Sequence, residues 1–215
     1  DGSLYMTHND QGWVAEILPS GQARILSPGG MIVPQGLAVM TGTDNQDVVF
    51  QADLFSLRQF NGRSGQQEDQ FKAFLVPPPA PPGTLFLTLP QNISASGSDL
   101  VISSFFNSVV QIWNPEEGVT KEFVDQVAAP IDAVRLNSGE VIVSDIGRSG
   151  VFSMNDPTTN IQPLLAASGM ATDGTSVWAA DWFTGNIYKI VFDGGTPTSL
   201  PEPVFGGLHG PEGLA

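Results

Sequence analysis

The chain has 215 residues, no cysteine and a net charge of −14, with 41% hydrophobic and 14% charged residues. This composition indicates a folded domain, and the lack of cysteine excludes disulfide bonds and thiolate metal sites. So few cations argue against nucleic acid and anionic membranes as partners, because both are bound through lysine and arginine. No apolar run reaches the roughly 20 residues that a membrane-spanning helix needs.

A short apolar strand closed by a small, polar or acidic residue recurs five times along the chain. The five copies read Leu4–His8, Val49–Asp53, Leu100–Ser104, Val141–Asp145 and Val177–Asp181. Their starts are separated by 45, 51, 41 and 36 residues. A period of this length is typical of the blades of a β-propeller.

The segments around each copy repeat as well. A Pro-x-Gly-Leu-Ala type segment precedes the copies and is clearest at Pro34–Ala38 and Pro211–Ala215. An alternating strand such as Trp13–Ile17 follows, and then a fourth strand such as Gln22–Leu26. Alternation marks strands with a buried face, and turn residues separate the four strands of each period. The sequence therefore predicts an all-β fold, a single β-propeller domain of four-stranded blades over residues 1–215.

The two ends of this pattern are incomplete. The chain opens on a second strand and closes on Pro211–Ala215, which reads as a first strand. Either this last segment completes the first blade and closes a five-blade ring, or the chain is a fragment of a six-bladed propeller. The shortness of the last segment favours the fragment. The proline-rich stretch Val76–Pro82 is expected to be a stiff connector between blades, with a proline-rich recognition segment as the alternative.

Acidic residues close three of the five copies, at Asp53, Asp145 and Asp181. A residue that recurs once per blade is better explained by architecture than by catalysis. Aspartate at the end of a strand can accept hydrogen bonds from nearby backbone N–H groups. We therefore expect these carboxylates to cap the bends between strands and loops.

Aromatic residues follow the second strands at Phe55, Phe105, Phe106, Trp182 and Phe183. In a propeller, these loops open beside the loops that precede the first strands, around the mouth of the central channel. Exposed together, the aromatic side chains would line an apolar small-molecule site. The alternative is that they pack inward between blades. Arg148 occupies the matching place in its own blade and would pair with an anionic ligand.

The repeats resemble those of the NHL-repeat and senescence-marker/gluconolactonase superfamily of β-propellers. The resemblance covers nearly the whole chain and is carried by segments such as Pro34–Ala38, Asp173–Thr175, Val177–Asp181 and Asn186–Ile190. Relatives of this kind include calcium-dependent lactonases, a streptogramin-type lyase and non-catalytic binding modules. The resemblance therefore implies a fold without fixing a function.

In the lactonase branch, the residue between proline and glycine binds a divalent cation at the channel mouth. Glu212 matches that position, Gln35 matches it with an amide, and Asn92 aligns more loosely. Ile131 and Ser168 depart from the pattern. Calcium takes about six to eight oxygen ligands, usually with several carboxylates, so the resemblance implies only a sparse Ca²⁺ site. The alternative is that Glu212 lies in a solvated channel.

The chain's two histidines, His8 and His209, both fall in loops that are expected at the channel mouth. A carboxylate such as Glu212 near His209 could orient an imidazole as a general base. The resemblance implies the same residue type, because the streptogramin-type lyases place a histidine with a metal at the channel mouth. The alternative is that both are ordinary residues of surface loops.

Two classes of function follow from these residues. The first is a small-molecule-binding propeller with its site at the channel mouth. Whether that site also acts as a metal-assisted, lactonase-like hydrolase or lyase is left open by the sequence. The second is a non-catalytic ligand-binding, protein-binding or scaffold propeller. No organic cofactor is indicated. A secreted or periplasmic location is favoured, and the compartment is left open.

Overall fold

The computed structural model describes residues 2–27, 29–42, 44–72, 89–198 and 202–214. The proline-rich stretch Val76–Pro82 lies outside the described residues, and so does Ala215. Within these ranges the helical structure is a 3₁₀ turn, η1 (Ile146–Arg148). No helix in this part of the chain is long and apolar enough to cross a membrane.

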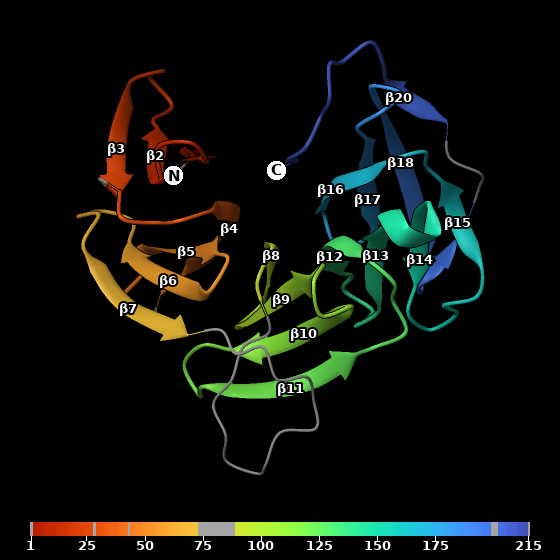
Figure 1. The fold of residues 1–215 in the computed structure, drawn as a ribbon, viewed down its shortest axis with the longest axis horizontal. Coiled ribbons are helices and arrows are strands. Elements are labelled where there is room, and N and C mark those ends of the chain that lie inside the picture. Colours follow the sequence, from red (N-terminus) through yellow and green to blue (C-terminus); the bar gives the residue numbers. More distant parts are fainter. Residues whose placement is uncertain (1, 28, 43, 73–88, 199–201, 215) are drawn as a thin grey trace.

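The strands form five antiparallel sheets, one for each repeat, which we call blades I to V (Figure 1). Blade I has β1 (Leu4–His8), β2 (Trp13–Ile17) and β3 (Ala23–Ser27). Blade II has β4 (Pro34–Thr41), β5 (Asp47–Asp53), β6 (Ser56–Asn61) and β7 (Gln67–Lys72). Blade III has β8 (Asn92–Ser96), β9 (Asp99–Ser104), β10 (Val109–Asn114) and β11 (Val119–Val124). Blade IV has β12 (Pro130–Arg135), β13 (Val141–Asp145), β14 (Gly150–Ser153) and β15 (Asn160–Pro163). Blade V has β16 (Ala167–Thr172), β17 (Ser176–Asp181), β18 (Asn186–Asp193), β19 (Thr196–Pro197) and β20 (Pro203–Phe205).

The predicted β-propeller is confirmed. Each of the five repeated phrases forms the second strand of a blade, and the predicted third strand Trp13–Ile17 coincides with β2. The blades follow one another around an arc, with β4, β8, β12 and β16 on its inner side (Figure 1). In blade V, β20 takes the fourth place by pairing with β18, and β19 forms a short hairpin with the end of β18.

Apolar side chains fill the spaces between neighbouring blades. Four clusters lie between blades I and II, II and III, III and IV, and IV and V. Strand β9 shows the pattern: Leu100 and Ile102 face blade II, whereas Val101 faces blade IV. Both faces of such a strand are buried, and each large apolar side chain contributes about 1.5–3 kcal/mol by leaving water. The blades are therefore held to one another mainly by side-chain packing.

A row of hydroxyl groups links the inner strands of neighbouring blades. Each is the next-to-last residue of a second strand and donates to a carbonyl in the first strand of the following blade. The bonds run from Thr7 Oγ1 to the Gln35 carbonyl (3.1 Å), from Ser103 Oγ to Ile131 (2.8 Å) and from Ser144 Oγ to Ser168 (2.6 Å). These bonds fix how far each blade is offset from the next.

Blades II and V depart from this row, because alanine occupies the equivalent position in each, Ala52 and Ala180. In blade V, Ser168, one strand further in, donates instead to the carbonyl of Pro211 at 2.6 Å. The last described segment thus runs beside β16, while β1 is paired only with β2 among the described strands. Closure of a five-blade ring and membership of a larger ring both stay predictions.

Asp132 lies on the inner strand β12 with its carboxyl group buried between blades IV and V. One carboxyl oxygen accepts the N–H of Ala133 at 2.8 Å, and the other accepts the N–H of Met170 in β16 at 2.7 Å. Burial raises the pKa of Asp132 to about 7, and the two backbone donors only partly oppose that rise.

We predict that Asp132 makes the protein less stable as the pH rises from about 4 to about 7. Because its pKa is raised on folding, the folded state holds the proton over this range whereas the unfolded state releases it. One pKa unit corresponds to about 1.4 kcal/mol, so the free energy of unfolding should fall by a few kcal/mol. Urea unfolding at a series of pH values measures this slope. Asp132→Asn should flatten it, and an equal slope in that variant would contradict the assignment.

Candidate functional site

One face of the propeller is built from two sets of loops, and we call it the loop face. The first set joins second strands to third strands, and the second set leads from each blade into the next first strand. Backbone bonds join the two sets, from Leu54 N to the Val33 carbonyl and from Trp182 N to Ala166. The described loop face comprises residues 8–13, 29–33, 53–56, 89–91, 104–109, 124–130, 145–150, 163–167, 181–186 and 206–213.

The closing aspartates hold the two sets of loops together. Asp181, at the end of β17, accepts the backbone N–H groups of Leu165 (2.9 Å) and Ala166 (3.1 Å) from the connector into its blade. Its carboxylate also accepts N–H groups from the loop that follows, at Phe183 and Thr184. Burial tends to raise the pKa of Asp181, but these backbone donors prevail and hold it below the ordinary value.

The same arrangement recurs in two other blades. Asp145 accepts the N–H groups of Ala128 (2.7 Å) and Ala129 (2.9 Å), and Asp53 accepts those of Ile32 and Val33, both at 2.9 Å. The prediction that the closing aspartates cap backbone N–H groups is therefore confirmed. We call each such carboxylate with its connector amides an aspartate clamp.

Blades I and III place other residues where the clamp would be. In blade III, the Asn107 side-chain oxygen accepts the N–H of Leu89, and Ser104 Oγ donates to that same oxygen at 2.8 Å. In blade I, the residue is His8, whose ring lies 4.6 Å from that of Trp13. His8 Nδ1 is buried and has no hydrogen-bond partner among the described residues.

Four of the five predicted aromatic residues are exposed on the loop face, whereas Phe105 is half-buried with its ring centre 5.3 Å from that of Phe106. Phe55 is 50% exposed, Phe106 63%, Trp182 48% and Phe183 72%. The Trp182 ring lies against Gly210, where a Cβ atom would come within 2.6 Å of the indole nitrogen. These four side chains therefore point outward and do not pack between blades.

Aliphatic neighbours, which sequence reasoning missed, extend this apolar surface. Eight of the fifteen exposed large hydrophobic side chains belong to the loop face: Ile32, Phe55, Phe106, Ile146, Leu165, Trp182, Phe183 and Leu208. The connectors lie against the loops that hold the aromatic residues, as where Trp182 N–H donates to the Ala166 carbonyl. The Pro-x-Gly-Leu-Ala segments gave no signal for these aliphatic residues, because three of them precede those segments in variable connectors and Ile146 follows a second strand.

Arg148 makes contacts within the protein that the sequence did not indicate, and its pairing with an anionic ligand stays a prediction. Its guanidinium group donates to the Gln126 carbonyl at 3.1 Å and to the Pro157 carbonyl. The same group lies 3.7 Å from the centre of the Phe152 ring. Arg148 thus ties a connector to the turn between β14 and β15, and its donors are engaged within the protein.

The predicted metal ligands occupy separate environments. Glu212 is exposed on the segment beside β16, and Gln35 lies half-buried in β4. The Asn92 side-chain oxygen accepts the N–H of Ile93. Asn92 pairs with Ser103 as Asp132 pairs with Ser144, so the residue of blade III equivalent to Gln35 is Gln91.

The described residues contain no group of three or more His, Asp or Glu side chains that could hold a metal ion. His209 is exposed, and neither it nor His8 makes a hydrogen bond or ion pair with Glu212 in the part of the chain that the structure describes. The catalytic and metal roles assigned to these residues from the sequence stay predictions.

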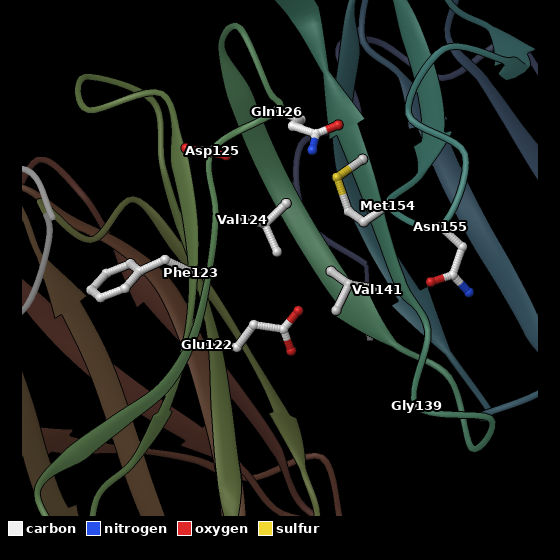
Figure 2. Close-up of a pocket in the computed structure, with 9 residues that line it drawn as sticks. All are labelled: Glu122, Phe123, Val124, Asp125, Gln126, Gly139, Val141, Met154 and Asn155. Atoms are coloured by element: carbon white, nitrogen blue, oxygen red, sulfur yellow. The ribbon is translucent and has the colours of Figure 1, made fainter. Parts of the chain in front are cut away.

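A shallow groove with a volume of about 180 Å³ lies between blades III and IV, away from the inner strands (Figure 2). Val124 and Val141 belong to the apolar cluster between these blades and form part of its lining. Glu122 and Asp125 come from β11 and the connector after it, and Met154 from the turn after β14. Nothing in the repeat pattern predicted this groove, because it depends on the packing of one blade edge against the next.

The sequence matches no protein-family model and no curated protein sequence. The fold is similar to a chain of a nidogen/laminin complex, with a TM-score of 0.67 and 13% identity over 93% of this chain and 75% of that one. It is similar to a streptogramin B lyase, with a TM-score of 0.64 and 15% identity over 99% and 68% of the two chains. It is also similar to a putative gluconolactonase, with a TM-score of 0.64 and 14% identity over 93% and 73%.

These neighbours are β-propellers of the kind that the sequence resembles, and they include gluconolactonase-like and lyase members. At 13–15% identity, the likeness establishes the fold alone. The chain spans about two thirds to three quarters of the length of these three proteins. Function has to be argued from the residues on the loop face.

We predict that Asp181→Ala loosens blade V without unfolding the other blades. Two connector amides and two loop amides lose their acceptor, and such losses cost about 1–3 kcal/mol in the free energy of unfolding. Hydrogen exchange followed by mass spectrometry should show faster exchange at residues 163–167 and unchanged exchange at residues 29–33. Asp10→Ala, which removes an exposed carboxylate outside the clamps, serves as the control. Unchanged exchange at 163–167 in the Asp181 variant would contradict the clamp.

Proposed function

We propose that this chain is a non-catalytic binding propeller that takes an apolar ligand on its loop face. The observation that carries the proposal is the concentration of exposed aromatic and aliphatic side chains on that face. Large contiguous apolar patches on a soluble protein mark interaction sites, because leaving such surface in water is unfavourable. The clamps hold the patch in place before any ligand arrives, which lowers the entropy lost on binding.

A metal-assisted, lactonase-like hydrolase or lyase is the second candidate. Its support is the similarity of the fold to a streptogramin B lyase and to a putative gluconolactonase. The residues that would carry it are His8, His209 and Glu212, with Gln35 and Asn92 as further ligands for Ca²⁺. It ranks second because the described residues hold no group of three or more His, Asp or Glu side chains that could bind a metal ion, and because Arg148 donates to backbone carbonyls within the fold.

The binding proposal predicts that the neutral dye Nile red binds to the loop face. Trp182→Ala combined with Phe183→Ala should weaken dye binding about tenfold, because aromatic anchors contribute most of the energy of such sites. Fluorescence titration measures the affinity. Ile25→Ala, which truncates an exposed apolar residue of β3, is the matched control and should bind as the unaltered protein does. Equal affinities for all three proteins would contradict the proposal.

The same proposal predicts that Nile red binding is unchanged by EDTA and that the protein does not hydrolyse small lactones. Calorimetric titration with Ca²⁺, together with a pH-stat assay for lactone opening, tests both statements. Ca²⁺-dependent hydrolysis that disappears in Glu212→Gln would replace the binding proposal with the enzyme. A retained activity in that variant would remove Glu212 from the candidate ligands.

A further inference from the structure

The loop face is strongly acidic as well as apolar. Its described residues include six carboxylates and a single arginine. Asp10, Asp125 and Glu212 are exposed, whereas Asp53, Asp145 and Asp181 are the buried acids of the clamps. The arginine is Arg148, and its guanidinium group donates to the backbone carbonyls of Gln126 and Pro157.

Only one of the buried clamp acids has a cationic partner among the described residues. Asp53 pairs with Arg58 at 3.0 Å, and the same guanidinium group donates to the Gly30 carbonyl. Asp145 and Asp181 accept hydrogen bonds from backbone donors, including the N–H of Arg148 for Asp145, and neither forms an ion pair with a lysine or arginine in the described structure. Because backbone donors hold the pKa of Asp181 below its ordinary value, this acid is charged at neutral pH.

The negative charge of the face therefore stays uncompensated within the described chain. A ligand that covers the apolar side chains would also displace water from carboxylates around them. Such a ligand gains from carrying positive charge beside its apolar groups, and an anionic ligand is repelled. The net charge of −14 adds a field over the whole molecule that attracts cationic ligands from a distance.

The spread of the apolar side chains over several blades indicates the size of the ligand. Phe55 belongs to blade II, Phe106 to blade III, Ile146 to blade IV, and Trp182 and Phe183 to blade V. A small molecule covers one or two of these loops, whereas a polypeptide segment can place successive side chains over several. Aromatic anchors within a polar rim are also the composition of protein-binding surfaces.

We infer that the ligand of the loop face is a protein segment that alternates apolar and basic side chains. This inference rests on the proposed function and adds the chemistry of the partner to it. The apolar residues of the segment pack on the aromatic and aliphatic surface, and its lysine or arginine residues lie against Asp10, Asp125 and Glu212. Anionic membranes, the other large apolar partners, are repelled by the same carboxylates.

The test uses three synthetic peptides of one length that share the same leucine positions and carry lysine, glutamate or serine between them. Fluorescence anisotropy should show the lysine peptide binding at least about tenfold more tightly than the other two, with an affinity that falls as salt is added. Replacing three acids of the face (Asp10→Asn, Asp125→Asn and Glu212→Gln) should remove most of that preference.

A matched triple variant controls for the overall charge of the protein. Glu116→Gln, Asp193→Asn and Glu202→Gln remove three exposed carboxylates outside the loop face and should leave the lysine peptide bound as before. Equal effects of the two triple variants would overturn the inference, because the attraction would then belong to the whole molecule.

Two further outcomes separate the inference from the proposed function. If Nile red binds at Trp182 and Phe183 while the lysine peptide binds no better than the glutamate peptide, the partner chemistry is wrong and the binding function stands. If neither the dye nor any peptide depends on these two residues, both fail. Binding of phosphatidylserine vesicles in preference to the lysine peptide would also overturn the inference.

Discussion

The aspartate clamp is the interaction on which the rest of this structure depends. A connector that passes between blades exposes backbone N–H groups that no β-ladder can satisfy, and leaving them unpaired is costly. Asp181 and its counterparts accept these groups in pairs from the buried end of a second strand. The same bonds draw each connector against the loop after that strand. Each clamp aspartate thereby belongs to the packed inner part of the propeller and also determines the shape of its loop face.

The placement of the apolar surface follows from that coupling. With the connector held by the carboxylate, Leu165 has its N–H turned inward and its side chain turned to solvent, beside Trp182 and Phe183. Ile32 is held in the same way by Asp53. The clamp carboxylates that give this order also add to the acidic character of the face, together with the exposed acids in its loops.

The sequence predicted the blades well because their signals are local and repeated. Alternation and period located the second strands, and β1 has the predicted bounds Leu4–His8. The capping role of Asp145 was also predictable, since it depends on position within the repeat. The engagement of Arg148 and the groove beside Val141 were not, because both depend on contacts between segments that the repeat does not encode. The register of Asn92 was ambiguous because the glycine and leucine of the Pro-x-Gly-Leu-Ala segment are replaced in its blade, where the sequence reads Pro90-Gln91-Asn92-Ile93.

The central claim is that the clamped, apolar and acidic loop face is the binding surface of this protein. The most direct measurement is a titration of the ¹⁵N-labelled protein with the lysine peptide, followed by two-dimensional NMR. Shifts should be confined to loop-face signals, including the Trp182 indole and the amides of Phe183, Leu165 and Ile32. Shifts concentrated instead at Glu122, Val141 and Met154, or on the outer strands, would contradict it.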